Sequence, residues 1–97
     1  MTDPVVVGRT RTPEGHEIVL TAIRWAKIIE GHPEIADHLD TILHTVSDPD
    51  HRQPDPVAGR ERFFRRGGPE RWMRVVTDVE HIITAFAQTN DPVYDHE

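Results

Sequence analysis

The spacing of the apolar residues changes once along the chain, and this change determines the fold class that we predict. Between residues 22 and 46, apolar side chains recur with the spacing of helices that bury one face. Between residues 60 and 87 they form short runs separated by turn signals, which is typical of strands. A chain of 97 residues has room for one core. We therefore predict a single α+β domain, with two N-terminal helices packed on a three- to four-stranded antiparallel sheet.

Two helices are predicted in the first half of the chain. Thr21 is a suitable N-cap for a first helix, which Gly31 ends. His32 would cap a second helix that begins at Pro33 and extends to about Val46. The apolar face of this second helix is formed by Ile35, Leu39, Ile42, Leu43 and Val46.

The segments around the helices are predicted with less regular structure. Short strands at Val5–Val7 and Glu17–Leu20 flank a turn at residues 13–15, and we expect residues 1–14 to be loosely attached to a domain covering 1–88. Residues 47–59 contain three prolines and no periodicity, which predicts a long loop. Residues 89–97 are predicted to be an acidic, flexible tail.

Three strands are predicted in the second half, at residues 60–66, 71–77 and 81–87, with a first turn at Gly67-Gly68-Pro69. The second turn sets the register. Three turn residues, 78–80, would put Arg74 opposite Thr84 and Trp72 opposite Phe86, and this register is the one that we favour. It leaves for the core Met73, Val75, Ile83 and Ala85. A two-residue turn at 79–80 would instead put Thr84 beside Val75.

The net charge of −6 is unevenly distributed. Residues 52–74 contain seven arginines and three acidic residues, so this segment carries +4 while the rest carries −10. An arginine offers a planar, permanently charged group that suits phosphate or carboxylate. The segment is therefore either a phosphate-binding surface or an exposed sheet face kept soluble by its arginines.

The absence of cysteine excludes thiol catalysis, redox switching and zinc sites of the cysteine type. The chain has neither a signal-peptide pattern nor a long apolar run, so we expect a cytoplasmic protein without membrane contact. Two acid–histidine pairs, Glu34 with His38 and Asp40 with His44, have helical i,i+4 spacing. Because the pairs lie on different sides of the predicted helix, we expect no metal site and no cofactor.

Five strings in a fixed order carry a resemblance to a known family. They are Arg24-Trp25-Ala26-Lys27-Ile28-Ile29-Glu30-Gly31-His32-Pro33-Glu34, Asp48-Pro49-Asp50, Gly59-Arg60-Glu61-Arg62-Phe63-Phe64-Arg65-Arg66, Trp72-Met73-Arg74-Val75-Val76 and Ile82-Ile83-Thr84-Ala85-Phe86. Over about residues 18–90 the chain resembles the phage-borne branch of the barnase–EndoU–colicin E5/D–RelE-like nucleases and, by its layout, the BrnT toxins. The resemblance implies a helix pair followed by an antiparallel sheet. It also implies metal-independent cleavage of RNA, with RNA and an antitoxin-like or immunity protein as partners.

Cleavage of this kind uses the ribose 2′-OH as the nucleophile and requires a base, an acid and cations at the phosphate. His32 is the candidate base, because a helix N-terminus favours the neutral imidazole; the alternative is that it serves only as a cap. Arg65 and Arg74 are candidates for contacts to the transition state. Thr84 is a candidate for a hydrogen bond to a phosphate oxygen, or an ordinary strand residue.

Further residues are candidates for binding RNA. Arg60, Arg62 and Arg66 would contact phosphate, and Trp72 and Phe86 would stack on bases, unless Trp72 packs in the core. Arg65 and Arg66 are adjacent and must point to opposite faces of a flat strand. The resemblance implies a tyrosine in many relatives where this chain has Phe86, so a chain that lacks this hydroxyl uses another acid or binds RNA without cleaving it. The oligomeric state is left open.

Overall fold

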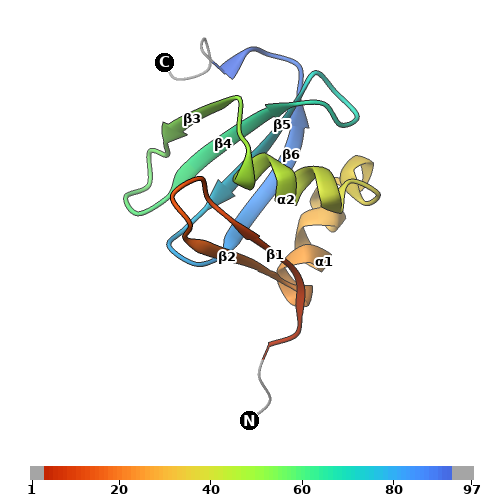
Figure 1. Ribbon diagram of the computed structural model, residues 1–97. Helices are drawn as coiled ribbons and strands as arrows, with labels where there is room; N and C mark the ends of the chain where they lie inside the picture. Colours follow the sequence, from red (N-terminus) through yellow and green to blue (C-terminus); the bar gives the residue numbers. More distant parts are fainter. Residues whose placement is uncertain (1–3, 93–97) are drawn as a thin grey trace.

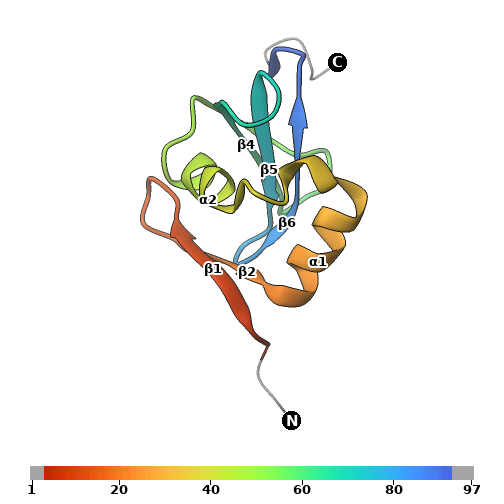
Figure 2. The same ribbon diagram turned by 90° about the vertical axis from the view of Figure 1, so that its right-hand side faces the viewer.

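The computed structural model describes residues 4–92 as an α+β fold in which both helices lie on one face of a four-stranded antiparallel sheet (Figures 1 and 2). The sheet order is β3-β4-β5-β6, and a separate two-stranded hairpin, β1-β2, lies beside the helices. In chain order the elements are β1 (Val6–Arg11), β2 (Glu17–Thr21), α1 (Ala22–Gly31), the 3-10 helix η1 (Pro33–Ile35), α2 (Leu39–Ser47), β3 (His51–Pro54), β4 (Glu61–Arg66), β5 (Trp72–Thr77) and β6 (Ile82–Gln88).

The prediction that the helices are N-terminal is wrong, because the β1-β2 hairpin precedes them. β1 is longer than the predicted strand at residues 5–7 because its polar half is also used in packing. The Thr10 hydroxyl donates to the carbonyl of Leu43 at 2.9 Å, and Gly8 lies directly against the Leu43 side chain. Of the residues for which we expect loose attachment, 6–11 thus form a strand in contact with α2.

The first helix begins and ends where the sequence predicts. The Thr21 hydroxyl accepts the backbone N–H of Arg24 at 3.2 Å, and α1 ends at Gly31. The second helix is not continuous, however: η1 covers only three residues and α2 begins at Leu39. The break follows from the packing, because η1 contacts α1 and β6 whereas α2 packs on β1, β4 and β5. The chain must therefore change direction between residues 36 and 38.

β3 lies within the segment 47–59 for which we predict a loop, so that prediction is wrong in part. β3 pairs with β4 along its whole length, with His51 opposite Phe64 and Pro54 opposite Glu61. Proline is tolerated there because β3 is an edge strand. Its sequence, His-Arg-Gln-Pro, contains no apolar alternation from which a strand could be predicted.

Neither predicted register holds along the whole of β5 and β6: the two-residue turn at 79–80 is confirmed where Thr77 lies opposite Ile82, but the pairing beyond it matches neither prediction. Arg74 lies opposite Phe86 and Val76 opposite Thr84, and an irregularity between Val76 and Thr77 then shifts the pairing. The turn is shaped by Asp78, whose carboxylate accepts the backbone N–H groups of Glu80 and His81 at 2.8 and 2.6 Å. The shift is an even number of residues, so Arg74, Thr84 and Phe86 still share one face, as the favoured register predicts.

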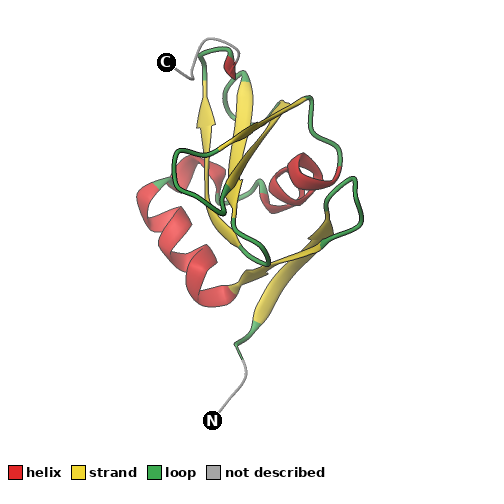
Figure 3. Cartoon of the chain, turned by 90° about the vertical axis from the view of Figure 1, so that its left-hand side faces the viewer, coloured by secondary structure: helices red, strands yellow, loops and turns green. Residues whose placement is uncertain are grey.

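The core lies between the helices and the inner face of the sheet (Figure 3). Met73, Val75 and Ala85 are buried there, as predicted, but Ile82 takes the place predicted for Ile83 because of the irregularity in the pairing. The predicted apolar face of the second helix is confirmed, since Ile35, Ile42 and Val46 are fully buried and Leu39 and Leu43 pack against them.

The predicted tail begins as ordered structure. The Thr89 hydroxyl donates to the Glu70 carboxylate at 3.2 Å, and Pro92 is fully buried. Residues 93–97, which make up the rest of the predicted tail, lie outside the described residues. Within residues 4–92, no helix combines the length and the apolar character needed to cross a membrane.

Candidate nucleic-acid interface

The face of the sheet that points away from the helices, here called the outer face, carries a row of side chains across all four strands. The register brings His51 of β3, Phe64 of β4, Arg74 of β5 and Phe86 of β6 directly opposite one another. The rings of His51 and Phe64 are 5.7 Å apart between centroids. The Arg74 guanidinium lies over both phenylalanines, 5.6 Å from the Phe64 centroid and 5.0 Å from that of Phe86. These contacts have the geometry of cation–π interactions.

His32 extends this row beyond the edge of the sheet. Its ring is stacked on Phe86, with 5.3 Å between centroids and an interplanar angle of 24°. His32 stands between α1 and η1, so the packing of these helices along β6 brings it to the outer face. Two candidates that are 42 positions apart in sequence, His32 and Arg74, thus contact the same aromatic ring.

A second row lies beside the first and consists of Arg66, Trp72 and Gln88. The Arg66 guanidinium is 5.1 Å from the Trp72 ring centroid. Trp72 is only 5% exposed, and its indole N–H is buried without a hydrogen-bond acceptor in the described part of the chain. Trp72 therefore packs beneath Arg66, whereas Phe86 is half-buried and lies beside open space.

That open space is a shallow pocket of about 370 Å³ at the end of β6. It is lined by Arg74, Phe86, Gln88, Thr89 and Asn90. The pocket thus offers one guanidinium, one aromatic ring and several hydrogen-bonding groups, which are the components that hold an unpaired nucleotide in proteins. Thr84 of β6 lies opposite Val76 of β5, in the row next to that of Arg74 and on the same face of the sheet.

Arg52 and Arg62, by contrast, are held by carboxylates. Arg52 donates to both Glu61 oxygens at 2.7 and 2.9 Å and to Glu14 at 2.7 Å. Arg62 donates to Asp55 at 2.8 Å, and the two side chains are only 15% and 10% exposed. Burial raises the pKa of Asp55, but hydrogen bonds from the Val57 N–H and from Arg62 outweigh it, so this pKa lies below its ordinary value. Arg62, which was predicted to contact phosphate, thus forms an ion pair within the protein instead.

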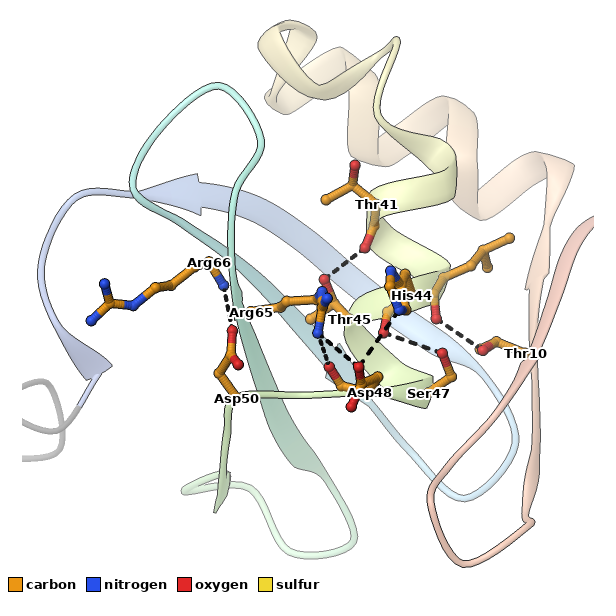
Figure 4. Close-up of polar contacts among 10 residues, drawn as sticks. Thr10, Thr41, His44, Thr45, Ser47, Asp48, Asp50, Arg65 and Arg66 are labelled. Atoms are coloured by element: carbon orange, nitrogen blue, oxygen red, sulfur yellow. Dashed lines mark hydrogen bonds and ion pairs between the residues drawn. The ribbon is translucent and has the colours of Figure 1, made fainter.

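Arg65 lies on the opposite face of the sheet from Arg66, as predicted for adjacent strand residues (Figure 4). Its guanidinium donates to the backbone carbonyl and, at 3.1 Å, to the carboxylate of Asp48, the residue that follows α2. The same carboxylate lies 3.7 Å from the His44 ring nitrogen. Arg65 therefore ties β4 to the C-terminal end of α2, where the partial negative charge of the helix favours a cation. It is separated by the sheet from Arg74 and His32.

The environment of His32 differs from the one predicted. Its side chain makes no capping hydrogen bond, and η1 has only three residues, so the helix-terminus argument for a neutral imidazole does not apply. Instead, Nδ1 lies 3.6 Å from a carboxylate oxygen of Glu34. The imidazole is 39% exposed and therefore accessible to a ligand in front of Phe86.

His51 and Phe64 were not among the site residues predicted from the sequence. Phe64 is placed by the pairing of β4 with β5, and His51 by the pairing of β3, an unpredicted strand, with β4. Arg60 is exposed and directly precedes β4, outside the row. Within residues 4–92, no three histidine or acidic side chains are grouped so that they could hold a metal ion. Comparison with protein-family models, with curated proteins and with solved structures finds no significant match.

Proposed function

We propose that the outer face binds RNA and cleaves it without a metal ion. One observation carries the proposal: Phe86 contacts both the imidazole of His32 and the guanidinium of Arg74, beside a pocket with the size and chemistry for one nucleotide. A base, a cation and a stacking ring are thereby available to a single nucleotide. The resemblance to the nuclease superfamily and an antitoxin-like partner stay predictions.

In the proposed reaction, His32 accepts the proton of the ribose 2′-OH, whose oxygen attacks the adjacent phosphorus. The bond to the 5′ oxygen breaks, and this oxygen takes a proton from solvent water. Arg74 stabilises the charge that accumulates on the phosphorane, and Thr84 donates to a phosphate oxygen from the same face. Arg65 has no part in this mechanism, because it bonds to Asp48 on the other side of the sheet.

The test is incubation of the purified protein with end-labelled single-stranded RNA in the presence of EDTA. The expected product carries a 2′,3′-cyclic phosphate and disappears with His32→Ala. His44→Ala is the matched control, because His44 is an exposed histidine on α2 that contacts Asp48 and is remote from Phe86. Loss of activity in both variants, or in neither, would contradict the assignment of His32.

A second candidate function is RNA binding without cleavage, and one observation favours it. Phe86 contacts both His32 and Arg74 but has no hydroxyl that could serve as an acid. Intact RNA across several substrates, together with salt-dependent binding, would support this alternative. Phe86→Tyr then provides a direct check, because it adds a hydroxyl at that position and leaves the ring in place.

A further inference from the structure

A second pocket, of about 330 Å³, lies at the opposite end of β6 from the nucleotide pocket. It is formed where three parts of the chain meet: the start of α1, the segment before β1, and the turn between β5 and β6. Two backbone hydrogen bonds hold these parts together, from the Ala22 N–H to the Val5 carbonyl and from the Val19 N–H to the Glu80 carbonyl, each at 2.8 Å. In Figure 1 this region is the lower part of the molecule, around β1, β2 and α1.

One side of this pocket is cationic. Arg24 and Lys27 project from one side of α1 and are exposed, and neither forms an ion pair within the described residues. The turn between β5 and β6 contributes His81, whose ring nitrogen lies 3.7 Å from the Asp78 carboxylate. Asp78 is itself occupied by two backbone N–H groups. The Asp78 carboxylate keeps its negative charge, but both exposed cations of this side, Arg24 and Lys27, are available to a ligand and outnumber it.

Exposed aliphatic side chains occur in the lining of this pocket and next to its lining residues in sequence. Ile23 lines the pocket and is 71% exposed. Val5 adjoins the pocket residue Pro4 and is 66% exposed, and Val79 adjoins Asp78 and is 77% exposed. These three side chains are among the few large hydrophobic residues that the described chain leaves exposed. Large apolar side chains that gather on a surface beside a pocket indicate a binding site.

We infer that this region, here called the α1 patch (Val5, Ile23, Arg24, Lys27, Val79 and Ile83), docks a partner protein through a segment with acidic and aliphatic side chains. The two cations complement carboxylates, and the isoleucines and valines gain free energy only where apolar groups cover them. A phosphodiester backbone would pair with the cations but would leave the aliphatic side chains exposed to solvent. The outer face, in contrast, combines arginines with aromatic rings. The inference does not depend on the proposed function.

The test uses uniformly ¹⁵N-labelled protein titrated with a short synthetic peptide of glutamate and leucine, followed through its amide resonances. A lysine–leucine peptide tests the charge, a glutamate–serine peptide tests the apolar contacts, and an oligouridylate RNA tests nucleic acid. We expect the glutamate–leucine peptide alone to shift the amides of Ile23, Arg24, Lys27 and Ile83. The double variant R24E/K27E should lose about tenfold or more in affinity, because both cations then repel the peptide.

Arg11→Glu is the matched control, because Arg11 is an exposed arginine on β1 outside the pocket lining, and it should leave the affinity unchanged. Three outcomes would overturn the inference. The first is that no peptide shifts these amides, and the second is that RNA shifts them as strongly as the peptide does. The third is that the protein self-associates in sedimentation experiments and Ile23→Glu abolishes this, which would assign the α1 patch to a second copy of the chain.

Discussion

Arg65 and Arg66 are neighbours with the same side chain, and the fold predicts opposite effects when each is changed to methionine. Arg65 is bonded to Asp48 beneath the sheet, so its charge is already compensated. Arg66 lies over Trp72 on the outer face, and its guanidinium has no carboxylate partner within residues 4–92. Of these two arginines, only Arg66 should therefore neutralise an RNA phosphate.

The magnitude follows from counterion release. Each phosphate that a cation neutralises on a single strand contributes about 0.7 to the slope of log affinity against log salt. Arg66→Met should reduce the slope by about 0.7, whereas Arg65→Met should leave it unchanged. When the salt concentration rises fourfold, the affinity of Arg66→Met should therefore fall by a factor about 2.5 times smaller than that of the unmodified protein.

Fluorescence anisotropy of a labelled single-stranded RNA, measured over a series of KCl concentrations, gives these slopes. Circular dichroism must first establish that each variant is folded, because Arg65→Met removes hydrogen bonds at the end of α2 and should cost about 1 kcal/mol of stability. A slope that falls as much for Arg65→Met as for Arg66→Met would refute the assignment of the outer face as the RNA-binding surface.

Three further predictions concern stability. Arg62→Met leaves the Asp55 carboxylate nearly buried without its cation and should lower the free energy of unfolding by about 3 kcal/mol in urea titrations; a loss below about 1 kcal/mol would contradict the role of this pair. The pKa of Asp78 is lowered because backbone N–H groups outweigh its burial, and that of Asp55 is lowered as well, so both carboxylates stabilise the fold above the ordinary pKa of aspartate. This contribution should disappear as the pH falls through the lowered values, and in Asp78→Asn the unfolding free energy should depend less on pH below about 4. Gly68→Ala should destabilise by about 1–2 kcal/mol, since the glycine has a φ of 86° and an added Cβ would lie 3.1 Å from the end of the Met73 side chain; an unchanged melting temperature would show that the turn relaxes.

The features that were predictable from the sequence are those that depend on neighbouring residues. The cap at Thr21, the end of α1 at Gly31 and the apolar face of the second helix follow from spacing along one element. The opposite orientation of Arg65 and Arg66 follows from the alternation of any strand.

The features that were missed depend on contacts distant in sequence. The break between η1 and α2 arises because the two segments pack on different strands, and β3 is recognisable only through its pairing with β4. For the site, His32, Arg74 and Phe86 were all candidates, but the contact of Phe86 with both others depends on a register that the Asp78 turn sets. Arg65 was predicted as a catalytic candidate, because nothing in the neighbouring sequence indicates that its side chain bonds to Asp48.

The two groups that meet at Phe86 belong to different parts of the fold. Arg74 is fixed within the sheet, whereas His32 follows a helix whose position depends on the buried side chains Ile28 and Ile35. α1 has ten residues and is thus about 15 Å long, with Arg24 in its first turn, Lys27 near its middle and His32 directly after its last residue. A small tilt of this helix changes the separation of imidazole and guanidinium without altering either residue. The distance between these two side chains is therefore set by how α1 and η1 pack against β6 and not by the sheet alone.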